Sequence, residues 1–203
     1  MRRSDVVTGL GIVAGAYAIG GIPFSNIAAR RARGVDLRDV GSGTVSGTSL
    51  YRVAGFGPLA LAGVLEVAKG APGVVAAGRR RPVVAALAGG AAVVGHNWSP
   101  YLRGAGGRGL SPAIGALLAR RWQGAVLLLG GMVGGRLLRQ TALGSLGAQL
   151  ALIPVLGALD GADGAMAGAA LVTPMLVKRV AGNAPAARRR VLLTRLLVDR
   201  DEW

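Results

Sequence analysis

Long apolar segments separated by short polar breaks constrain this chain more than any other feature of its sequence. They lie at about residues 6–28, 54–78, 82–99, 110–119, 122–136, 142–159 and 164–177. A helix crosses a bilayer comfortably with about 20 apolar residues, so the shorter segments must tilt or adjoin polar loops that dip into the protein. We therefore predict an all-α, polytopic integral membrane protein with about seven short transmembrane helices, and five or six spans as the alternative.

The composition agrees with a membrane protein. Hydrophobic residues make up 52% of the chain and charged residues only 16%, whereas about a quarter of a soluble domain is charged. The net charge of +15 could indicate a nucleic-acid partner, but the arginines cluster between the apolar segments and do not line one face. We therefore expect no nucleic acid. The chain has no cysteine, which excludes disulfides and thiolate metal sites.

The arginines also predict an orientation. The start of the chain, Met1-Arg-Arg-Ser, resembles a signal peptide, but the apolar stretch continues without a clear break to Ile22, so we expect a retained first span. With the N-terminus outside and alternating spans, most arginines fall in the inner loops and the tail. The triplet Arg79 to Arg81 opposes this arrangement. The prediction is a multi-pass protein with its N-terminus outside and its C-terminus in the cytoplasm.

Two glycine-rich polar loops lie among the apolar segments and are the main functional candidates. They read GSGTVSGTSLYR at residues 41–52 and GHNWSPYLRGAGGRG at residues 95–109. Glycines leave backbone N–H groups open to a ligand, and a neighbouring arginine attracts negative charge, so together they predict a phosphate site. Both loops fall on the cytoplasmic side in the predicted orientation. The alternative for the first loop is a solvated turn, with Arg52 at the membrane interface where a helix should begin.

Ionisable residues inside the apolar segments are further candidates. Glu66 and Lys69 lie three residues apart, on one face of a helix, and are either functional or a buried structural ion pair. His96 is the only histidine, and it is either a hydrogen-bonded structural group or a general base. No second histidine could complete a metal site. At a predicted helix start, Arg108 and its flanking glycines would surround an anion with N–H groups, helix dipole and guanidinium.

These residues, in this order, resemble the bacterial integral-membrane acyl-phosphate:glycerol-3-phosphate acyltransferases (the PlsY type), over nearly the whole chain. The family's G-S-G-N-x-G-A-T-N-x-x-R falls on residues 41–52, its L-D-x-x-K-G on 65–70, and its G-H-N-F-x-P-F-L-x-x-x-G-G-K-G on 95–109. Its G-S-I-P opening and its I-D-I-R-x-x-G-S-G match residues 21–24 and 35–43. A weaker element falls on Arg139 and Ser145, and a C-terminal element falls loosely on Arg179 to Asn183.

The chain departs from the family pattern at several positions. Glu66 stands for the family's aspartate and Arg108 for its lysine, so both keep their charge, and arginine can grip a phosphate in two places. The other departures are Thr44 and Ser49 for asparagine, Ser46 for glycine, Pro112 for threonine and Val180 for histidine. Because several of these remove hydrogen-bonding groups, the alternative function is a diverged, weakly active or non-enzymatic relative that binds phosphorylated lipid precursors.

The resemblance implies acyl transfer from acyl phosphate to the 1-hydroxyl of glycerol 3-phosphate, in phospholipid biosynthesis at the bacterial cell membrane. It implies neither cofactor nor metal, and the donor's own phosphate as base. Residues carried over for the acyl-phosphate site are Gly41, Ser42, Gly43, Thr44, Gly47 and Thr48. Those for catalysis are Arg52, Lys69, His96, Asn97 and Arg108. Those for the glycerol phosphate are Arg52, Gly106, Gly107, Arg108, Gly109, Arg139, Ser145 and Asn183.

Other classes fit less well. Acyl-CoA-dependent acyltransferases use a His-x4-Asp motif, but Tyr101 stands five residues after His96. CDP-alcohol phosphotransferases share only the start of their motif with Asp160 and Asp163, and no inverted repeat supports a transporter. Residues 1–183 are expected to form the transmembrane acyltransferase-like domain. Residues 184–203 are expected to form a basic amphipathic tail on the inner leaflet, and no soluble partner is indicated.

Overall fold

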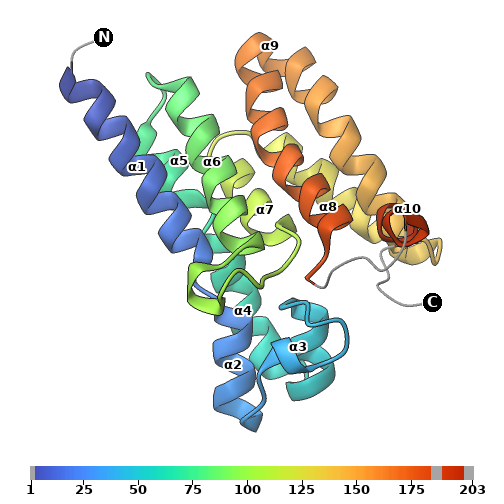
Figure 1. Cartoon of the computed structure of the whole chain (residues 1–203). Helices are drawn as coiled ribbons and strands as arrows, with labels where there is room; N and C mark the ends of the chain where they lie inside the picture. The colour runs from blue at the N-terminus through green and yellow to red at the C-terminus, as the bar shows by residue number, and fades with distance from the viewer. Residues whose placement is uncertain (1–2, 184–188, 199–203) are drawn as a thin grey trace.

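The computed structural model describes residues 3–183 and 189–198, and in these residues it contains helices and loops only. The first half holds α1 (Arg3–Gly21), α2 (Phe24–Arg33), η1 (Leu37–Asp39), α3 (Gly47–Ala54), α4 (Phe56–Ala68), α5 (Ala71–Ala77), α6 (Pro82–Asn97) and η2 (Pro100–Leu102). The second half holds α7 (Leu110–Leu118), α8 (Trp122–Leu137), α9 (Thr141–Ala181) and α10 (Arg189–Val198) (Figure 1). The predicted all-helical class is confirmed.

Two of the long segments change direction internally. The chain bends between α1 and α2 at Pro23, which cannot supply a backbone N–H to continue the helix. Helix α9 turns back on itself at Asp160 and Gly161, whose backbone is not helical, and Gly161 adopts a positive φ of 61°. Its two legs run side by side in Figure 1 and correspond to the predicted segments 142–159 and 164–177.

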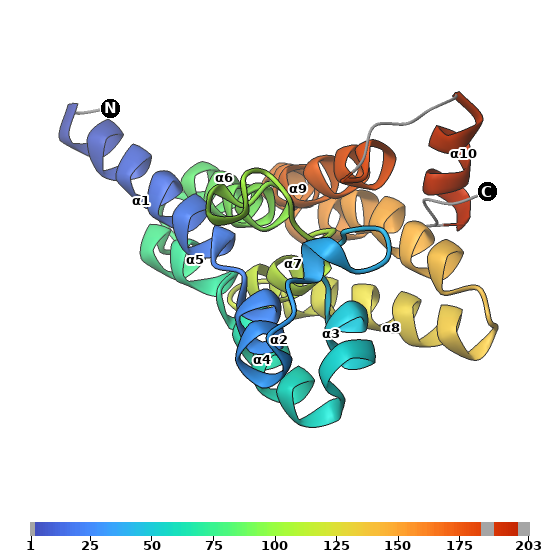
Figure 2. The same cartoon turned by 60° about the horizontal axis from the view of Figure 1, so that its bottom comes forward.

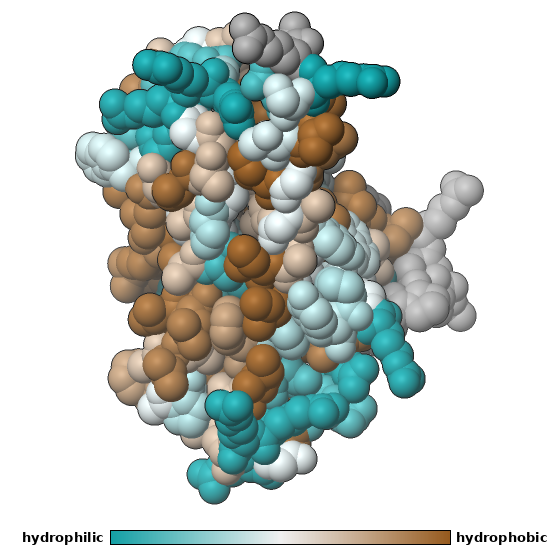
Figure 3. All heavy atoms as spheres, turned by 90° about the vertical axis from the view of Figure 1, so that its left-hand side faces the viewer, coloured by the Kyte–Doolittle hydropathy of each residue, from teal (hydrophilic) through white to brown (hydrophobic). Residues whose placement is uncertain are grey.

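The outside of the bundle is apolar. Within the described residues, three segments are long and apolar enough to cross a membrane, namely Arg3–Arg33, Phe56–Ala77 and Thr141–Ala181. Large apolar side chains on the outer surface include Val7, Leu10, Leu61, Val64, Val75, Val126 and Leu150. On the face drawn in Figure 3, hydrophobic side chains form a wide band between hydrophilic ends. A water-soluble protein rarely exposes so large an apolar surface, whereas contact with lipid requires one.

Small residues pack the helices against one another. Helices α1 and α6 lie together over much of their length, and alanine and glycine dominate the buried face of α6. A side chain on Gly20 would overlap the backbone of Ala92, and one on Gly95 would overlap the carbonyl of Tyr17. Lipid tails provide no hydrophobic drive for helix association, so close backbone contact through small residues is the main source of attraction.

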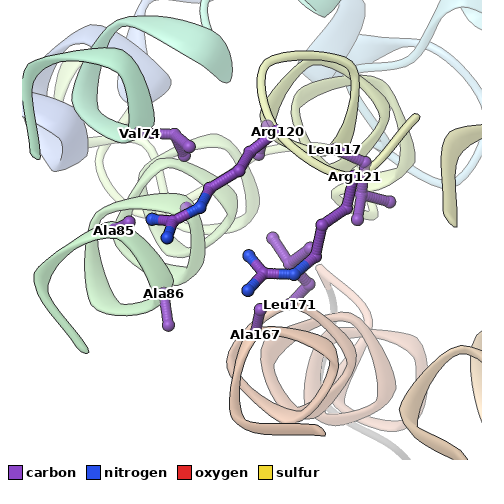
Figure 4. A pocket seen from close by; sticks show the side chains of 10 residues that line it. Val74, Ala85, Ala86, Leu117, Arg120, Arg121, Ala167 and Leu171 are labelled. Atoms are coloured by element: carbon purple, nitrogen blue, oxygen red, sulfur yellow. The ribbon is translucent and has the colours of Figure 1, made fainter. Parts of the chain in front are cut away.

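At the end of the bundle opposite the glycine-rich loops, two arginines bind neighbouring helices. Arg121 is buried, and its Nε lies 2.7 Å from Asp160 Oδ2 at the turn of α9. Arg120 donates to the carbonyl of Gly78, at the end of α5, over 3.2 Å. Figure 4 shows both side chains extending from the end of α7 into a small pocket between α6 and α9. Each guanidinium therefore joins two helix ends.

Part of the predicted tail can be compared with the structure. Residues 184–188 and 199–203 lie outside the described residues, and residues 189–198 form α10. This helix packs across the end of α9 (Figures 1 and 2). The domain boundary at residue 183 and the position of the tail on a membrane surface stay predictions.

We predict that Gly20→Ala lowers the free energy of unfolding by about 1–3 kcal/mol, because the new methyl group overlaps the backbone of α6. The matched control is Gly15→Ala on the same helix, where a methyl group meets nothing within 4 Å. That substitution should change the stability by less than about 1 kcal/mol. Thermal unfolding of the purified protein in detergent measures both, and equal stabilities would contradict this packing.

Candidate functional site

The first glycine-rich loop is built by local hydrogen bonds. Gly41 and Gly43 adopt positive φ values of 56° and 69°, which reverse the chain after η1. Ser46 then caps α3 by accepting a hydrogen bond from the N–H of Ser49 over 3.2 Å. The hydroxyl of Ser42 donates to that of Thr44 over 3.0 Å. The loop therefore presents several hydroxyls near the N-terminus of a helix.

A salt-bridged aspartate anchors the start of this loop. Asp36 accepts from the backbone N–H and the guanidinium of Arg38, and it also pairs with Arg30 on α2. The hydrogen-bonded guanidinium of Arg38 holds the pKa of the Asp36 carboxyl well below its usual range. Asp36 is therefore ionised at neutral pH and ties α2 to η1.

Asn183 joins the two loops. Its Nδ2 donates to Thr44 Oγ1 over 3.3 Å and to the carbonyl of Gly106 over 3.0 Å. Its Oδ1 accepts from the N–H of Gly106 over 3.2 Å and from Lys178 Nζ over 2.8 Å. The N–H of Val45 also donates to the carbonyl of Gly106 over 3.2 Å. One amide thus connects both loops with the end of α9.

Three cations lie near this junction, and one of them, Lys178, contacts Asn183 directly. Lys178 and Arg179 are almost completely buried, and Arg108 lies close enough to repel both electrostatically. The partners that the structure gives Lys178 are neutral, namely the Asn183 amide and the Trp98 ring, 5.2 Å from Nζ. Arg179 donates to the carbonyls of Ala142 and Leu196. Such a concentration of positive charge attracts an anion.

Lys178 was not among the candidate residues from the sequence. A lysine at the end of an otherwise apolar segment is costly to bury and is a functional candidate for that reason. It also lies five residues before Asn183, so the signal was present in the sequence. The family element at residues 179–183 begins one residue later, which explains why it was missed.

The glycines of the second loop allow close packing. Side chains on Gly106 or Gly107 would collide with His96 and with the backbone of Asn97. The N–H of Gly107 donates to the carbonyl of His96 over 3.2 Å, and that of Gly106 binds Asn183. These two N–H groups are therefore used inside the protein, whereas the sequence suggested that they would face a ligand. Gly109, with a φ of 82°, leads directly into α7 as predicted.

Glu66, Lys69 and His96 form a buried cluster behind the second loop. Glu66 Oε2 lies 2.6 Å from Lys69 Nζ and 3.2 Å from His96 Nδ1. The other oxygen of Glu66 accepts from the N–H of Ser25 over 2.9 Å, and Lys69 donates to the carbonyl of Ile22 over 2.7 Å. The cluster therefore satisfies the backbone groups left open by the bend between α1 and α2, and it supports the His96 ring that Gly107 packs against.

The remaining candidates lie in different surroundings. Asn97 is fully buried and donates to the carbonyl of Pro174 over 2.8 Å, which holds α6 against α9. Arg52 is exposed in the last turn of α3, because this helix begins at Gly47, earlier than expected. Arg139 is exposed in the turn between α8 and α9, and Ser145 is buried and accepts from Gln149 over 3.2 Å. Among the described contacts, none joins Arg52, Arg139 or Ser145 to the Asn183 junction.

Comparison with known proteins identifies the class. The family model described as glycerol-3-phosphate acyltransferase matches residues 10–187. The chain therefore belongs to this family. The protein is similar to the glycerol-3-phosphate acyltransferase of Synechococcus sp., with 33% identity over 175 residues, 85% of this chain and 87% of the relative. It is 41% identical to the enzyme of Shouchella clausii over 105 residues, 50% of this chain.

Solved structures of the same kind are also similar. The glycerol 3-phosphate form of PlsY, an integral membrane glycerol 3-phosphate acyltransferase, matches with a TM-score of 0.79 and 26% identity. The match covers 96% of this chain and 94% of that structure. The lysophosphatidic acid form shares the fold, with a TM-score of 0.76 and 22% identity. The predicted membrane fold is thereby confirmed, although the chain spans only about half the length of several curated relatives that it matches, 51% for Shouchella clausii.

We predict that Glu66→Gln lowers the free energy of unfolding by about 3–5 kcal/mol, because Lys69 then stays buried without its counter-ion. Thermal unfolding in detergent measures the change. The control is Asp5→Asn, which removes a surface pair with Arg81 at 3.6 Å and should cost at most about 1 kcal/mol. A Glu66→Gln variant as stable as the control would show that the cluster contributes no stability.

Proposed function

We propose that this protein transfers an acyl group from acyl phosphate to the 1-hydroxyl of glycerol 3-phosphate. The products are 1-acylglycerol 3-phosphate and inorganic phosphate. The observation that carries the proposal is the junction at Asn183, where two hydroxyl- and glycine-rich loops meet beside Arg108, Lys178 and Arg179. Membership of the glycerol-3-phosphate acyltransferase family supports it.

The chemistry needs little more than this geometry. Acyl phosphate is already activated, because phosphate is a good leaving group. The acceptor oxygen forms a bond to the carbonyl carbon, the carbon–oxygen bond to phosphate breaks, and the hydroxyl proton leaves with the departing phosphate. The protein therefore has to bring two phosphates together against their repulsion and aim one hydroxyl, which is catalysis by positioning and charge stabilisation. Clustered cations and loop hydroxyls suit that task.

The two phosphates are assigned to different parts of the junction. The loop at residues 41–48, with the exposed hydroxyls of Ser42 and Thr48, would cradle the head group of the donor. Arg108 and Asn183 would bind the acceptor phosphate. Arg52, Arg139 and Ser145 stay predicted ligands of the same phosphate, and no described contact joins them to the junction. We add Lys178 to the acceptor site, since it contacts Asn183 directly. Lys69, His96 and Asn97 would act by supporting the loops.

An amphipathic groove next to the loops fits a long-chain donor. It has a volume of about 760 Å³ and is lined by Ile22, Pro23, Asn26, Ile27, Arg30, Arg38, Tyr101, Leu102 and Arg103. Apolar and basic side chains therefore alternate over a short distance. Pro23 and Leu102 also line the small cavity at Glu66, Lys69 and His96. A donor with an acyl chain in the bilayer and an anionic head at the loops would pass along such a surface.

The proposed orientation places this end of the bundle in the cytoplasm. The loops at residues 34–46 and 98–109 and the end of α9 lie at one end, with Arg30, Arg31, Arg33, Arg38, Arg52, Arg103 and Arg108 near them. The opposite end holds Arg79 to Arg81, Arg120 and Arg121, of which three bind a helix end or an aspartate. The larger positive charge at the loop end favours the cytoplasmic side.

An assay of the purified protein tests the proposal. Palmitoyl phosphate is supplied with and without glycerol 3-phosphate, and released phosphate and acylated product are measured. We expect phosphate release to depend on the acceptor and to match the product one to one. Binding of the substrates without transfer would instead support the diverged, non-enzymatic relative, and hydrolysis independent of the acceptor would remove glycerol 3-phosphate from the proposal.

We predict that Arg108→Ala lowers acyl transfer at least about a hundredfold, because it removes a charge that stabilises the phosphates. Arg108→Lys should retain activity within about tenfold, since lysine keeps the charge but offers only one point of contact. The control is Arg80→Ala, an exposed arginine at the opposite end of the bundle, which should be fully active. Initial rates of acyl transfer at saturating donor measure the activity of each variant. An Arg108→Ala variant as active as the wild type would exclude this residue from the site.

A further inference from the structure

We propose that Arg195, on α10, is a positioning residue that places Asn183 at the junction of the two loops. The inference rests on the proposed function and extends it to a segment that carries none of the motifs. Helix α10 lies beyond residues 10–187, the part of the chain that matches the family. In the described contacts Arg195 reaches the site through the end of α9, and we do not expect it to touch substrate.

Arg195 is buried against the last turn of α9. The residue is only 2% exposed. Its Nη1 donates to the carbonyl of Ala181 over 2.7 Å and to that of Val180 over 3.4 Å. The last carbonyls of a helix have no partner within the helix. A guanidinium is well suited to them, since it supplies several N–H donors and a positive charge at the negative end of the helix dipole.

The same guanidinium shapes the turn that follows. Gly182 ends α9 with a φ of 65°, a conformation that favours glycine. Asn183 is the next residue in the chain, so the backbone conformation of Gly182 sets where Asn183 lies. A Cβ on Gly182 would lie 2.7 Å from Cζ of Arg195, so the arginine side chain packs flat against this glycine. The direction in which the chain leaves α9, and with it the position of the Asn183 amide, therefore depends on Arg195.

A second arginine makes the contact between α9 and α10 reciprocal. Arg179, on α9, donates through Nε to the carbonyl of Leu196 over 2.8 Å and through Nη2 to that of Ala142 over 2.7 Å. Each helix thus places a buried arginine on the backbone of the other. This arrangement holds α10 across the end of α9 and keeps Arg195 in place.

The hydrogen bonds that join the two loops depend on the exact position of the Asn183 amide. Its amide makes four hydrogen bonds, to Thr44, to both backbone groups of Gly106, and to Lys178. Hydrogen bonds weaken quickly with distance and misalignment, so a shift of the turn at Gly182 would loosen both loops together. A contact at Arg195 can therefore affect transfer from outside the site.

The test is a double-mutant cycle with acyl transfer as the readout. We expect Arg195→Ala to lower kcat/KM for glycerol 3-phosphate about tenfold, the size of effect of losing a hydrogen bond to a charged group. In the Asn183→Ala background the same substitution should change kcat/KM less than about twofold, because the amide that it positions is already gone. Arg195→Lys, with fewer donors, should fall between Arg195→Ala and the wild type.

Two controls separate this role from a general loss of structure or of membrane contact. Arg31→Ala removes an exposed arginine from α2, and Leu197→Ala removes an exposed apolar side chain from α10 itself; both should retain wild-type activity. Hydrogen–deuterium exchange should rise at residues 41–48 and 104–109 in Arg195→Ala and equally in Asn183→Ala. If Arg195→Ala does not fold, the Arg195→Lys variant runs the same cycle.

The outcomes are distinguishable. Equal fold losses in the wild-type and Asn183→Ala backgrounds, or unchanged exchange in the two loops, would overturn the positioning role. A loss of activity in Leu197→Ala as large as that in Arg195→Ala would assign the effect to α10 as a whole and also overturn it. If the wild-type protein transfers no acyl group, the proposed function fails, and the exchange measurement alone decides on the positioning.

Discussion

Close contact between backbones, permitted by glycine, is the constraint on which the rest of this structure depends. Gly20 and Gly95 bring α1 and α6 together, and Gly70 and Gly115 bring the helices around α4 and α7 together, each so closely that a Cβ would overlap a neighbouring carbonyl. Surrounded by lipid, helices gain little from burying apolar side chains against one another. Dispersion contacts between backbones take that role, and the helix ends that carry the loops follow from it.

A second set of interactions uses buried polar groups to fix the loops on this scaffold. At the bend between α1 and α2, Glu66 accepts from the N–H of Ser25 and Lys69 donates to the carbonyl of Ile22. Asn97 holds α6 to α9. Asn183 then joins the loops themselves. Because an unpaired polar group in a membrane interior is costly, each of these groups restricts its partners to one arrangement. The result is a connected set of loops near Arg108, Lys178 and Arg179, and this arrangement supports the proposed positioning of two phosphates.

Much of the fold and part of the site could be predicted from the sequence. The apolar segments matched α6, α7, α8 and both legs of α9 closely, because length and hydropathy decide what can reside in a bilayer. The segments 6–28 and 54–78 are each divided into two helices, and α3 lies within the loop predicted at residues 41–52. The two predicted glycine-rich loops do meet in the structure, but the N–H groups of Gly106 and Gly107 bind Asn183 and His96 and not a ligand. Lys178 was missed because the family element that marked this part of the chain begins one residue later, at Arg179.

Composition, segment length and motif spacing are local properties of the chain, and they define its class: a helical membrane protein with two glycine-rich polar loops. The tertiary structure alone decided which groups meet. That Asn183 bridges Thr44 and Gly106 across 139 and 77 residues, and that Arg195 caps the helix leading to it, depends on how the helices pack and on where α9 turns back. Such contacts depend on the angles between helices, which no local pattern of residues specifies.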